Sequence, residues 1–234
     1  MQTSRDAEIV AWIGRMGAVG AEHVMRCFGM SRSMAYHRLK ELARDRLLEH
    51  HAVLFGRPGM YSATRAGLRW QGLERLGVFR IGPGAFEHCW QVAHVAAELC
   101  CAMPAWGVLS ERDIRCVEAD VGGVFASAQV GGGDERRGLH RPDLALLSRD
   151  ERVVAIEVEL SIKSASRLAA ICRGWARARH VEGVCYLAAP GPARAVARAL
   201  RTTRTADRVC VLGLDEVGAL AAELCSGERG EALE

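Results

Sequence analysis

The sequence contains no apolar run that approaches the roughly 18 residues needed to cross a membrane. Its first residues, MQTSRDAEIVAWIGRMG, are charged and indicate an amphipathic helix, because they lack the apolar core and cleavage site of a signal peptide. An internal repeat, a Walker A motif and a G-x-G-x-x-G after a strand are also absent, which excludes the common phosphate-binding loops. The sequence therefore predicts a cytoplasmic protein with no membrane partner.

Metal-binding cysteine spacing is missing as well. The chain has nine cysteines, but none form a C-x-x-C pair, and the adjacent Cys100 and Cys101 would diverge on a helix. A zinc site or a disulfide framework therefore has no support. Most of the other cysteines lie in apolar settings, such as Cys185 and Cys210, and are predicted to be buried, reduced thiols.

The length and the charge distribution limit the class of protein further. The 234 residues allow one large domain or two small ones, and half of them are hydrophobic, which is enough for a sizeable core. Residues 1–84 hold 13 Lys and Arg against 7 acids, a balance of +6, whereas the remainder holds 18 against 21. A basic N-terminal third favours a nucleic-acid partner, although a solvated basic surface would give the same balance.

Three helices are predicted in this basic part. Apolar spacing indicates the first over residues 5–17 and a short second one within residues 20–29. The third begins after Ser31, a plausible N-cap, and runs to about Asp45. Its inward face would carry Ala35, Leu39 and Leu42. Its outward face would carry side chains that reach phosphates and base edges, namely Arg32, Ser33, Tyr36, His37, Lys40 and Arg44.

Two strand-like runs follow, at residues 47–55 and 60–67, around the turn GRPG. Three helices and a two-stranded hairpin are typical of a winged helix-turn-helix, expected here over residues 1–80. The third helix would enter the major groove, and Arg57 at the wing tip would reach phosphate or a narrow minor groove. The alternative is a winged helix used only for protein contacts.

The second domain is expected over residues 85–234, because Gly82, Pro83 and Gly84 indicate a loop at the domain boundary. A helix from Phe86 to Met103 would place His94 and Glu98 on one face. Strands are predicted at 113–120, 123–130, 142–147 and 152–160, with a flexible polar loop at 131–138. Helices at 164–180, 191–204 and 214–225 would then alternate with strands at 183–189 and 208–214. This order predicts an α/β (α+β) sandwich with a mixed central sheet.

Acidic residues interrupt two good strands in the stretch HRPDLALLSRDERVVAIEVELSIK, residues 140–163. Glu157 and Glu159 lie two apart and would project from the same side of a strand. The polar turn lets the strand after Asp143 pair antiparallel with theirs, so that all three acids meet. Three like charges are unfavourable together unless a cation neutralises them. Hard oxygen ligands suit Mg²⁺ or Mn²⁺, which can activate water against a phosphodiester.

RPD at 141–143, EVE at 157–159 and Lys163 resemble the PD-(D/E)-x-K nuclease superfamily of restriction enzymes and Holliday-junction resolvases. The resemblance implies a restriction-endonuclease-like domain, a metal-dependent DNA endonuclease activity, and Asp143 and Glu157 as metal ligands beside Glu159. Glu159 stands where the superfamily normally has Lys, although some restriction enzymes carry Glu there. Lys163 would then replace the missing Lys or contact phosphate. A further acid is expected from Glu98 or Glu111.

In its order of elements the chain resembles the replication-relaxation family of plasmid and mobile-element proteins over nearly its full length. This resemblance implies binding to double-stranded DNA and a role in plasmid replication, transfer or transcriptional control. A homodimer is a further expectation, because winged-helix regulators are often two-fold symmetric. The alternative is a non-enzymatic regulator whose second domain serves dimerisation or partner binding. Its acids would then pair with Arg141, Arg152 and Arg167.

Overall fold

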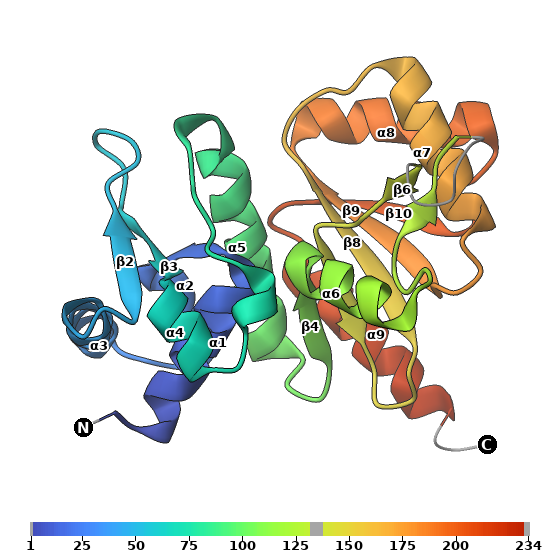
Figure 1. Ribbon diagram of the computed structural model, residues 1–234. Coiled ribbons are helices and arrows are strands. Elements are labelled where there is room, and N and C mark those ends of the chain that lie inside the picture. Colours follow the sequence, from blue (N-terminus) through green and yellow to red (C-terminus); the bar gives the residue numbers. More distant parts are fainter. Residues whose placement is uncertain (1, 132–137, 232–234) are drawn as a thin grey trace. The chain divides into compact units, whose positions relative to one another are not determined.

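The computed structural model describes residues 2–131 and 138–231, with side chains to residue 226, and divides into two compact units, Met1–Cys101 and Ala102–Glu234. The elements of both units are labelled in Figure 1. The predicted loop at 131–138 lies almost wholly outside the described residues. The expected boundary near residue 84 falls at the start of a long helix, whereas the two units divide at the end of that helix.

The first unit contains the three predicted helices and a small antiparallel sheet of strand order β1-β3-β2. Two 3₁₀ turns, at Glu74–Leu76 and Pro83–Ala85, precede its last helix. Its elements are α1 (Ser4–Met16), β1 (Ala18–Gly20), α2 (Ala21–Phe28), α3 (Arg32–Arg44), β2 (Leu48–His51), β3 (Met60–Ala63), α4 (Arg65–Trp70) and α5 (Phe86–Ala102).

Local signals place the helix ends of this unit. Thr3 and Asp6 form a reciprocal capping box at the start of α1, and Ser31 accepts the N–H of Met34 at the start of α3. Gly29 ends α2 in the left-handed conformation at φ 60°, which glycine adopts without strain. The apolar faces then form one core, which includes Ile9, Val10, Ile13, Val24, Ala35, Leu39, Leu42 and Leu68.

The second unit is a five-stranded mixed sheet of order β10-β9-β8-β7-β4, flanked by helices. Strands β8, β9 and β10 are parallel, whereas β7 is antiparallel to both β8 and β4, so the predicted mixed α/β class is confirmed. The elements are β4 (Gly107–Ser110), α6 (Glu111–Val121), β5 (Ala128–Gln129), β6 (Leu139–His140), β7 (Leu144–Leu147), β8 (Val153–Glu159), α7 (Ala165–Arg177), β9 (Gly183–Ala188), α8 (Pro190–Thr203), β10 (Val209–Gly213) and α9 (Val217–Glu231).

Two strand predictions in this unit are wrong. Residues 113–120 are part of helix α6, where Ser110 and Asp113 form a capping box and the buried Ile114 and Glu118 share one face at i,i+4 spacing. The segment is only three helical turns long, and in so short a segment the apolar pattern of a helix is difficult to distinguish from that of a strand. The strand predicted at 123–130 shrinks to the two residues of β5.

Helices α7 and α8 pack together against one face of the sheet. Leu168, Ile171 and Trp175 of α7 and Val196 of α8 join Ala155 and Tyr186 of the sheet in a single core. Both helices are therefore buried on one side only. The described residues include no helix that is long and apolar enough to cross a membrane.

The cysteine prediction holds only in part. All nine cysteines are free thiols, but only Cys172 and Cys185 are buried, and Cys101 and Cys210 are exposed. Apolar neighbours in the sequence did not ensure burial, because Cys210 lies on the edge strand β10.

Candidate functional site

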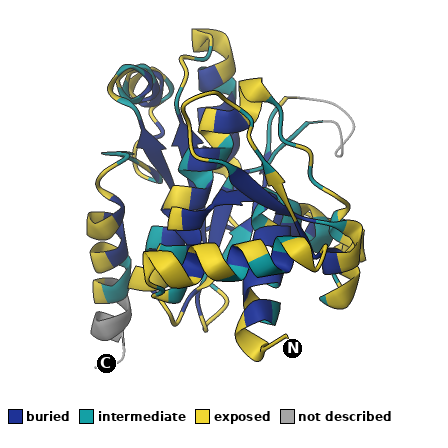
Figure 2. Cartoon of the chain, turned by 90° about the vertical axis from the view of Figure 1, so that its left-hand side faces the viewer, coloured by how far each residue is buried: buried dark blue, intermediate teal, exposed yellow. Residues whose placement is uncertain are grey.

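Helix α3 presents one polar surface. All six residues predicted for its outward face are exposed, while the predicted inward residues Ala35, Leu39 and Leu42 are buried. The Arg32 guanidinium lies over the Tyr36 ring, 5.6 Å from its centroid. In Figure 2, where the left side of Figure 1 faces the viewer, α3 crosses the front with exposed residues along its outer side. Helix α3 thus presents hydrogen-bond donors from its side chains along one exposed face.

The helix is held in place by an ion pair that the sequence did not reveal. Arg38 points inward and donates from Nε to Asp6 Oδ1 at 2.9 Å, with a second contact from its terminal nitrogen. Burial opposes ionisation of Asp6, but hydrogen bonds from Thr3 and Arg38 outweigh it, and the pKa of Asp6 is lowered. Because Asp6 also caps α1, a single carboxylate fixes α3 against α1.

Two of the arginines predicted to contact DNA form ion pairs within the protein. Arg44 pairs with Glu41 at 2.5 Å, within the same helix. Arg57 pairs with Glu87 at 2.9 Å and lies over the Phe86 ring at 5.3 Å, so this guanidinium is held against the start of α5. The large fully exposed side chain in the loop between β2 and β3 is Phe55, which no sequence pattern singled out.

The hairpin of β7 and β8 brings the three predicted acids toward one end of the sheet. Leu144 pairs with Ile156, so Asp143 lies beside the end of β8, where its Oδ2 accepts the Val158 N–H at 2.8 Å. Glu157 and Glu159 project from the same face of β8, and both are buried.

Each acid has its own partner. Glu157 Oε1 lies 2.7 Å from Nε2 of His140, and Glu159 is paired with the Lys163 ammonium. The expected arginine partners are wrong for the described residues. Arg141 pairs instead with Glu118 at 3.0 Å and Arg152 with Glu182 at 3.4 Å. Arg167 is exposed on α7.

The electrostatics of the pair His140–Glu157 follow from burial. Desolvation raises the pKa of Glu157 more than the neighbouring His140 lowers it, and Asp143 raises it further. Desolvation opposes protonation of His140, but the Glu157 charge and hydrogen bond outweigh it, and the pKa of His140 is raised. Lys163 also acts on both groups. Asp143, Glu157, His140 and Lys163 therefore form one interacting cluster.

Three residues of this region were missed. His140 directly precedes the RPD motif, but the motif itself does not include it. Tyr186 is the register partner of Glu157 on β9, and burial, followed by the Glu157 charge, holds its pKa well above the usual value. Glu118 was hidden because its segment was predicted as a strand; its carboxylate accepts the N–H groups of Phe125 and Ser127.

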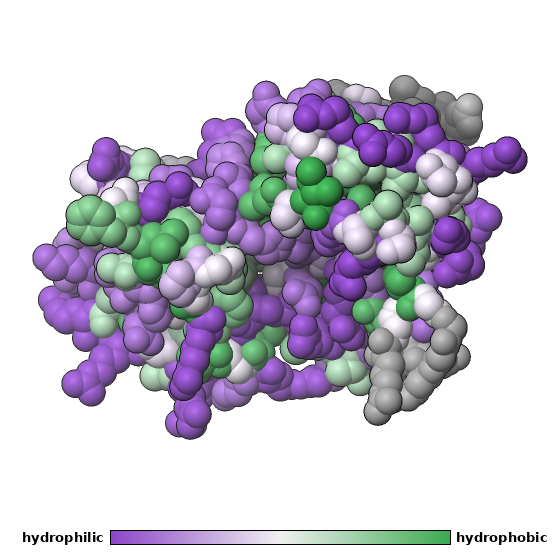
Figure 3. All heavy atoms as spheres, turned by 90° about the horizontal axis from the view of Figure 1, so that it is seen from above, coloured by the Kyte–Doolittle hydropathy of each residue, from purple (hydrophilic) through white to green (hydrophobic). Residues whose placement is uncertain are grey.

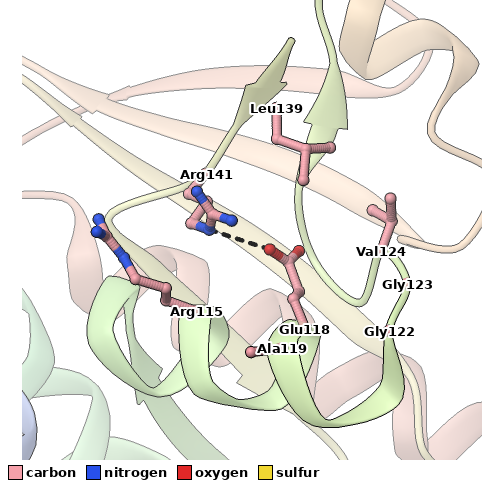
Figure 4. Close-up of a pocket in the computed structure, with 8 residues that line it drawn as sticks. All are labelled: Arg115, Glu118, Ala119, Gly122, Gly123, Val124, Leu139 and Arg141. Carbon is pink, nitrogen blue, oxygen red and sulfur yellow. Dashed lines mark hydrogen bonds and ion pairs between the residues drawn. The ribbon is translucent and has the colours of Figure 1, made fainter. Parts of the chain in front are cut away.

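Glu118 also forms one wall of a pocket of about 300 Å³ (Figure 4). The guanidinium of Arg141 reaches across from the segment after β6 to this carboxylate, and Arg115 lies on the near turn of α6. Arg141 lies between His140 and Asp143 in the sequence, so the Glu118–Arg141 pair holds the chain next to both residues of the cluster.

The other predicted acids lie elsewhere. Glu98 is in the first unit and pairs with Arg26 at 2.7 Å. Glu111 is half-buried in the first turn of α6 and pairs with Arg115 at 2.6 Å.

The acids predicted to hold Mg²⁺ or Mn²⁺ are paired within the chain in this arrangement. Among the described residues, no three His, Cys, Asp or Glu side chains are placed to hold a metal ion. The oxygens that would have to converge are directed to the Val158 N–H, to His140 and to Lys163. A divalent ion would need at least one of these pairs to open.

The chain matches no protein-family model, no curated protein and no solved structure.

Proposed function

We propose that the protein binds double-stranded DNA and reads its sequence through helix α3. The observation that carries this proposal is the exposed face of α3, whose Arg, Ser, Tyr, His and Lys side chains include donors for both phosphates and base edges. The single acid of α3, Glu41, lies outside this set of six residues.

The order of elements supports a winged helix-turn-helix as the fold of the first unit. Helices α1, α2 and α3 are followed by the β2–β3 hairpin, and β1 completes a three-stranded sheet. In such a domain the third helix enters the major groove. The Asp6–Arg38 pair would then keep the reading helix in a fixed orientation, which limits the entropy lost on binding.

The proposal is tested by selecting a preferred site from random duplexes and measuring its affinity with single alanine variants. Tyr36→Ala, His37→Ala and Lys40→Ala should each weaken binding to the selected site, by about 1–3 kcal/mol where the side chain contacts a base. Arg69→Ala, at an exposed position on α4, is the control and should leave the affinity nearly unchanged. Uniform binding to random DNA, insensitive to all three substitutions, contradicts the proposal.

Metal-dependent cleavage of DNA is a second candidate function, and the clustering of Asp143, Glu157 and Lys163 at the end of β8 favours it. The β7–β8–α7 arrangement is the setting that the PD-(D/E)-x-K resemblance implies. Against it, each acid already has a partner within the chain. That pairing favours the non-enzymatic regulator, in which the second unit serves dimerisation or partner binding.

Incubating the protein with supercoiled plasmid and Mg²⁺ or Mn²⁺ distinguishes the endonuclease from the non-enzymatic regulator. Cleavage that is lost in Asp143→Ala and Glu157→Ala, but kept in the turn variant Asp150→Ala, supports the endonuclease. No cleavage with either metal, while DNA binding is intact, rejects it and leaves the replication or transcription regulator.

A further inference from the structure

Basic residues are segregated within the second unit. Residues 102–234 hold 18 Lys and Arg against 19 acids, but residues 160–206 alone hold nine Lys and Arg and a single acid, Glu182. Helices α7 and α8 themselves contain no acid. Surfaces that only confer solubility usually mix both signs.

These charges lie on the outer sides of the two helices. We define the α7–α8 basic surface by six exposed arginines of α7, α8 and the C-cap of α8, which are Arg167, Arg173, Arg194, Arg198, Arg201 and Arg204. Arg177 is also exposed but is left out, because it donates to the Gln129 carbonyl oxygen. Within the described part of the chain, none of the six forms an ion pair with an acid. Figure 3, seen from above, shows many hydrophilic side chains over the second unit, with a few hydrophobic ones between them.

Three arginines are aligned along one face of α8. Arg194, Arg198 and Arg201 recur at i, i+4 and i+7 and share one helix face, over a rise of about 10 Å. Their helix is held on its other side, because Val196, Ala199 and Leu200 are buried in the core. The stripe is therefore presented on a rigid element.

We infer that the α7–α8 basic surface binds the phosphate backbone of duplex DNA without reading its sequence. The inference deepens the proposed function, and it rests on that function for the identity of the partner. The choice of arginine over lysine does not support the inference, since the whole chain has 29 arginines and two lysines. The inference is supported by the separation of basic from acidic residues, by the exposure of the six arginines and by their lack of acid partners.

Two other anionic partners fit less well. An amphipathic helix that lies on a membrane needs a free apolar face, whereas the apolar faces of α7 and α8 pack on the sheet. Single-stranded nucleic acid is held by exposed aromatic rings, and in the described residues neither helix exposes one. Backbone phosphates of a duplex require only a row of cations.

The test uses the full-length protein and a random-sequence duplex, titrated at several salt concentrations. The variant R194A/R198A/R201A should bind at least about tenfold more weakly at low salt, and its log–log salt slope should fall by about 0.9 for each phosphate that is no longer neutralised. The charge-keeping variant R194K/R198K/R201K should retain most of the affinity. Arg149→Ala, at an exposed position in the β7–β8 turn, is the single-charge control.

Unchanged affinity and slope in the triple alanine variant overturn the inference. A triple variant that binds phosphatidylserine vesicles more weakly but binds the duplex normally also overturns the inference. Thermal unfolding should be unaltered, since exposed helical arginines are replaced by a strong helix former. Failure of this inference is separable from failure of the proposed function: the first leaves the triple variant unaffected, whereas the second leaves the Tyr36, His37 and Lys40 variants unaffected.

Discussion

At the residue scale, Asp143, Glu157 and Glu159 are each stabilised in the fold by one neighbouring group. The sequence predicted that Asp143, Glu157 and Glu159 gather on one face, and the hairpin register brings them to the same end of the sheet. Their partners are a backbone N–H, an imidazole and an ammonium. Removing one partner of a buried pair leaves an uncompensated charge, which is costly.

The His140–Glu157 pair gives the first prediction. His140→Ala should lower the free energy of unfolding at neutral pH by about 3 kcal/mol, because it leaves Glu157 buried without its partner. Glu157→Gln should cost less, since its amide oxygen still accepts from His140. The double variant should recover part of the loss of His140→Ala. Urea unfolding of the three proteins measures these differences, and equal losses in His140→Ala and the double variant contradict the expectation.

Asp6 gives a prediction that depends on pH. Its folded-state pKa lies below the ordinary 3.8, so its ionised form stabilises the fold above that pH, and this stability is lost as the pH falls through the folded-state pKa. Asp6→Asn should therefore destabilise the protein at pH 7 by about 2 kcal/mol, since Arg38 is partly exposed. The difference should shrink as the pH is lowered below 3.8 toward the folded-state pKa of Asp6.

Denaturant unfolding at pH 7 and at a series of acid pH values below 3.8 measures the effect of Asp6→Asn. Glu8→Gln, an exposed change in the same helix, is the control and should show little effect at any of these pH values. A deficit in Asp6→Asn that is equally large in acid would show that the carboxylate charge is not responsible.

At the scale of elements, α7 approaches strand β5 through a glycine. A Cβ at Gly174 would lie 2.9 Å from the Gln129 carbonyl oxygen and 2.9 Å from a Val130 methyl carbon, closer than such contacts allow. Gly174→Ala should therefore destabilise the second unit by about 1–3 kcal/mol, as overpacking does. Gly218→Ala in α9, where a Cβ meets nothing within 4 Å, should be neutral or stabilising by up to about 1 kcal/mol. Thermal unfolding compares the two, and a stabilising Gly174→Ala refutes this packing argument.

The element scale also shows where sequence patterns were sufficient. The N-cap predicted at Ser31 is confirmed. Thr3 and Ser164, which were not predicted as caps, bond to the starts of α1 and α7 in the same local way. Helix α6 was predicted as a strand from its apolar alternation, although Ser110 and Asp113 form a capping box at its start. The short pairing of β5 with β6 depends on a partner distant in sequence, and no local pattern reveals its length.

For the whole molecule, we expect the two proposed DNA surfaces to make separable contributions to binding. Lys40→Ala should lower the ratio of selected-site to random-duplex affinity, whereas R194A/R198A/R201A should lower the salt slope and leave that ratio unchanged. The protein that combines both changes should show both deficits. Competition binding at two salt concentrations measures them, and a triple variant that alters the ratio would mean that the α7–α8 basic surface distinguishes sequences.

The sequence by itself determined the mixed α/β class, the positions of most helices, and the buried and exposed faces of α3. These properties follow from periodicity and capping, which act over a few residues. Only the tertiary structure decided which partner each acid takes, that Arg38 binds Asp6, and that Glu118 holds Arg141. Such pairs join residues that are distant along the chain, and hydrogen-bond geometry in the folded protein selects them. The exposure of the α7–α8 arginines was decided in the same way, by which faces of the two helices cover the sheet.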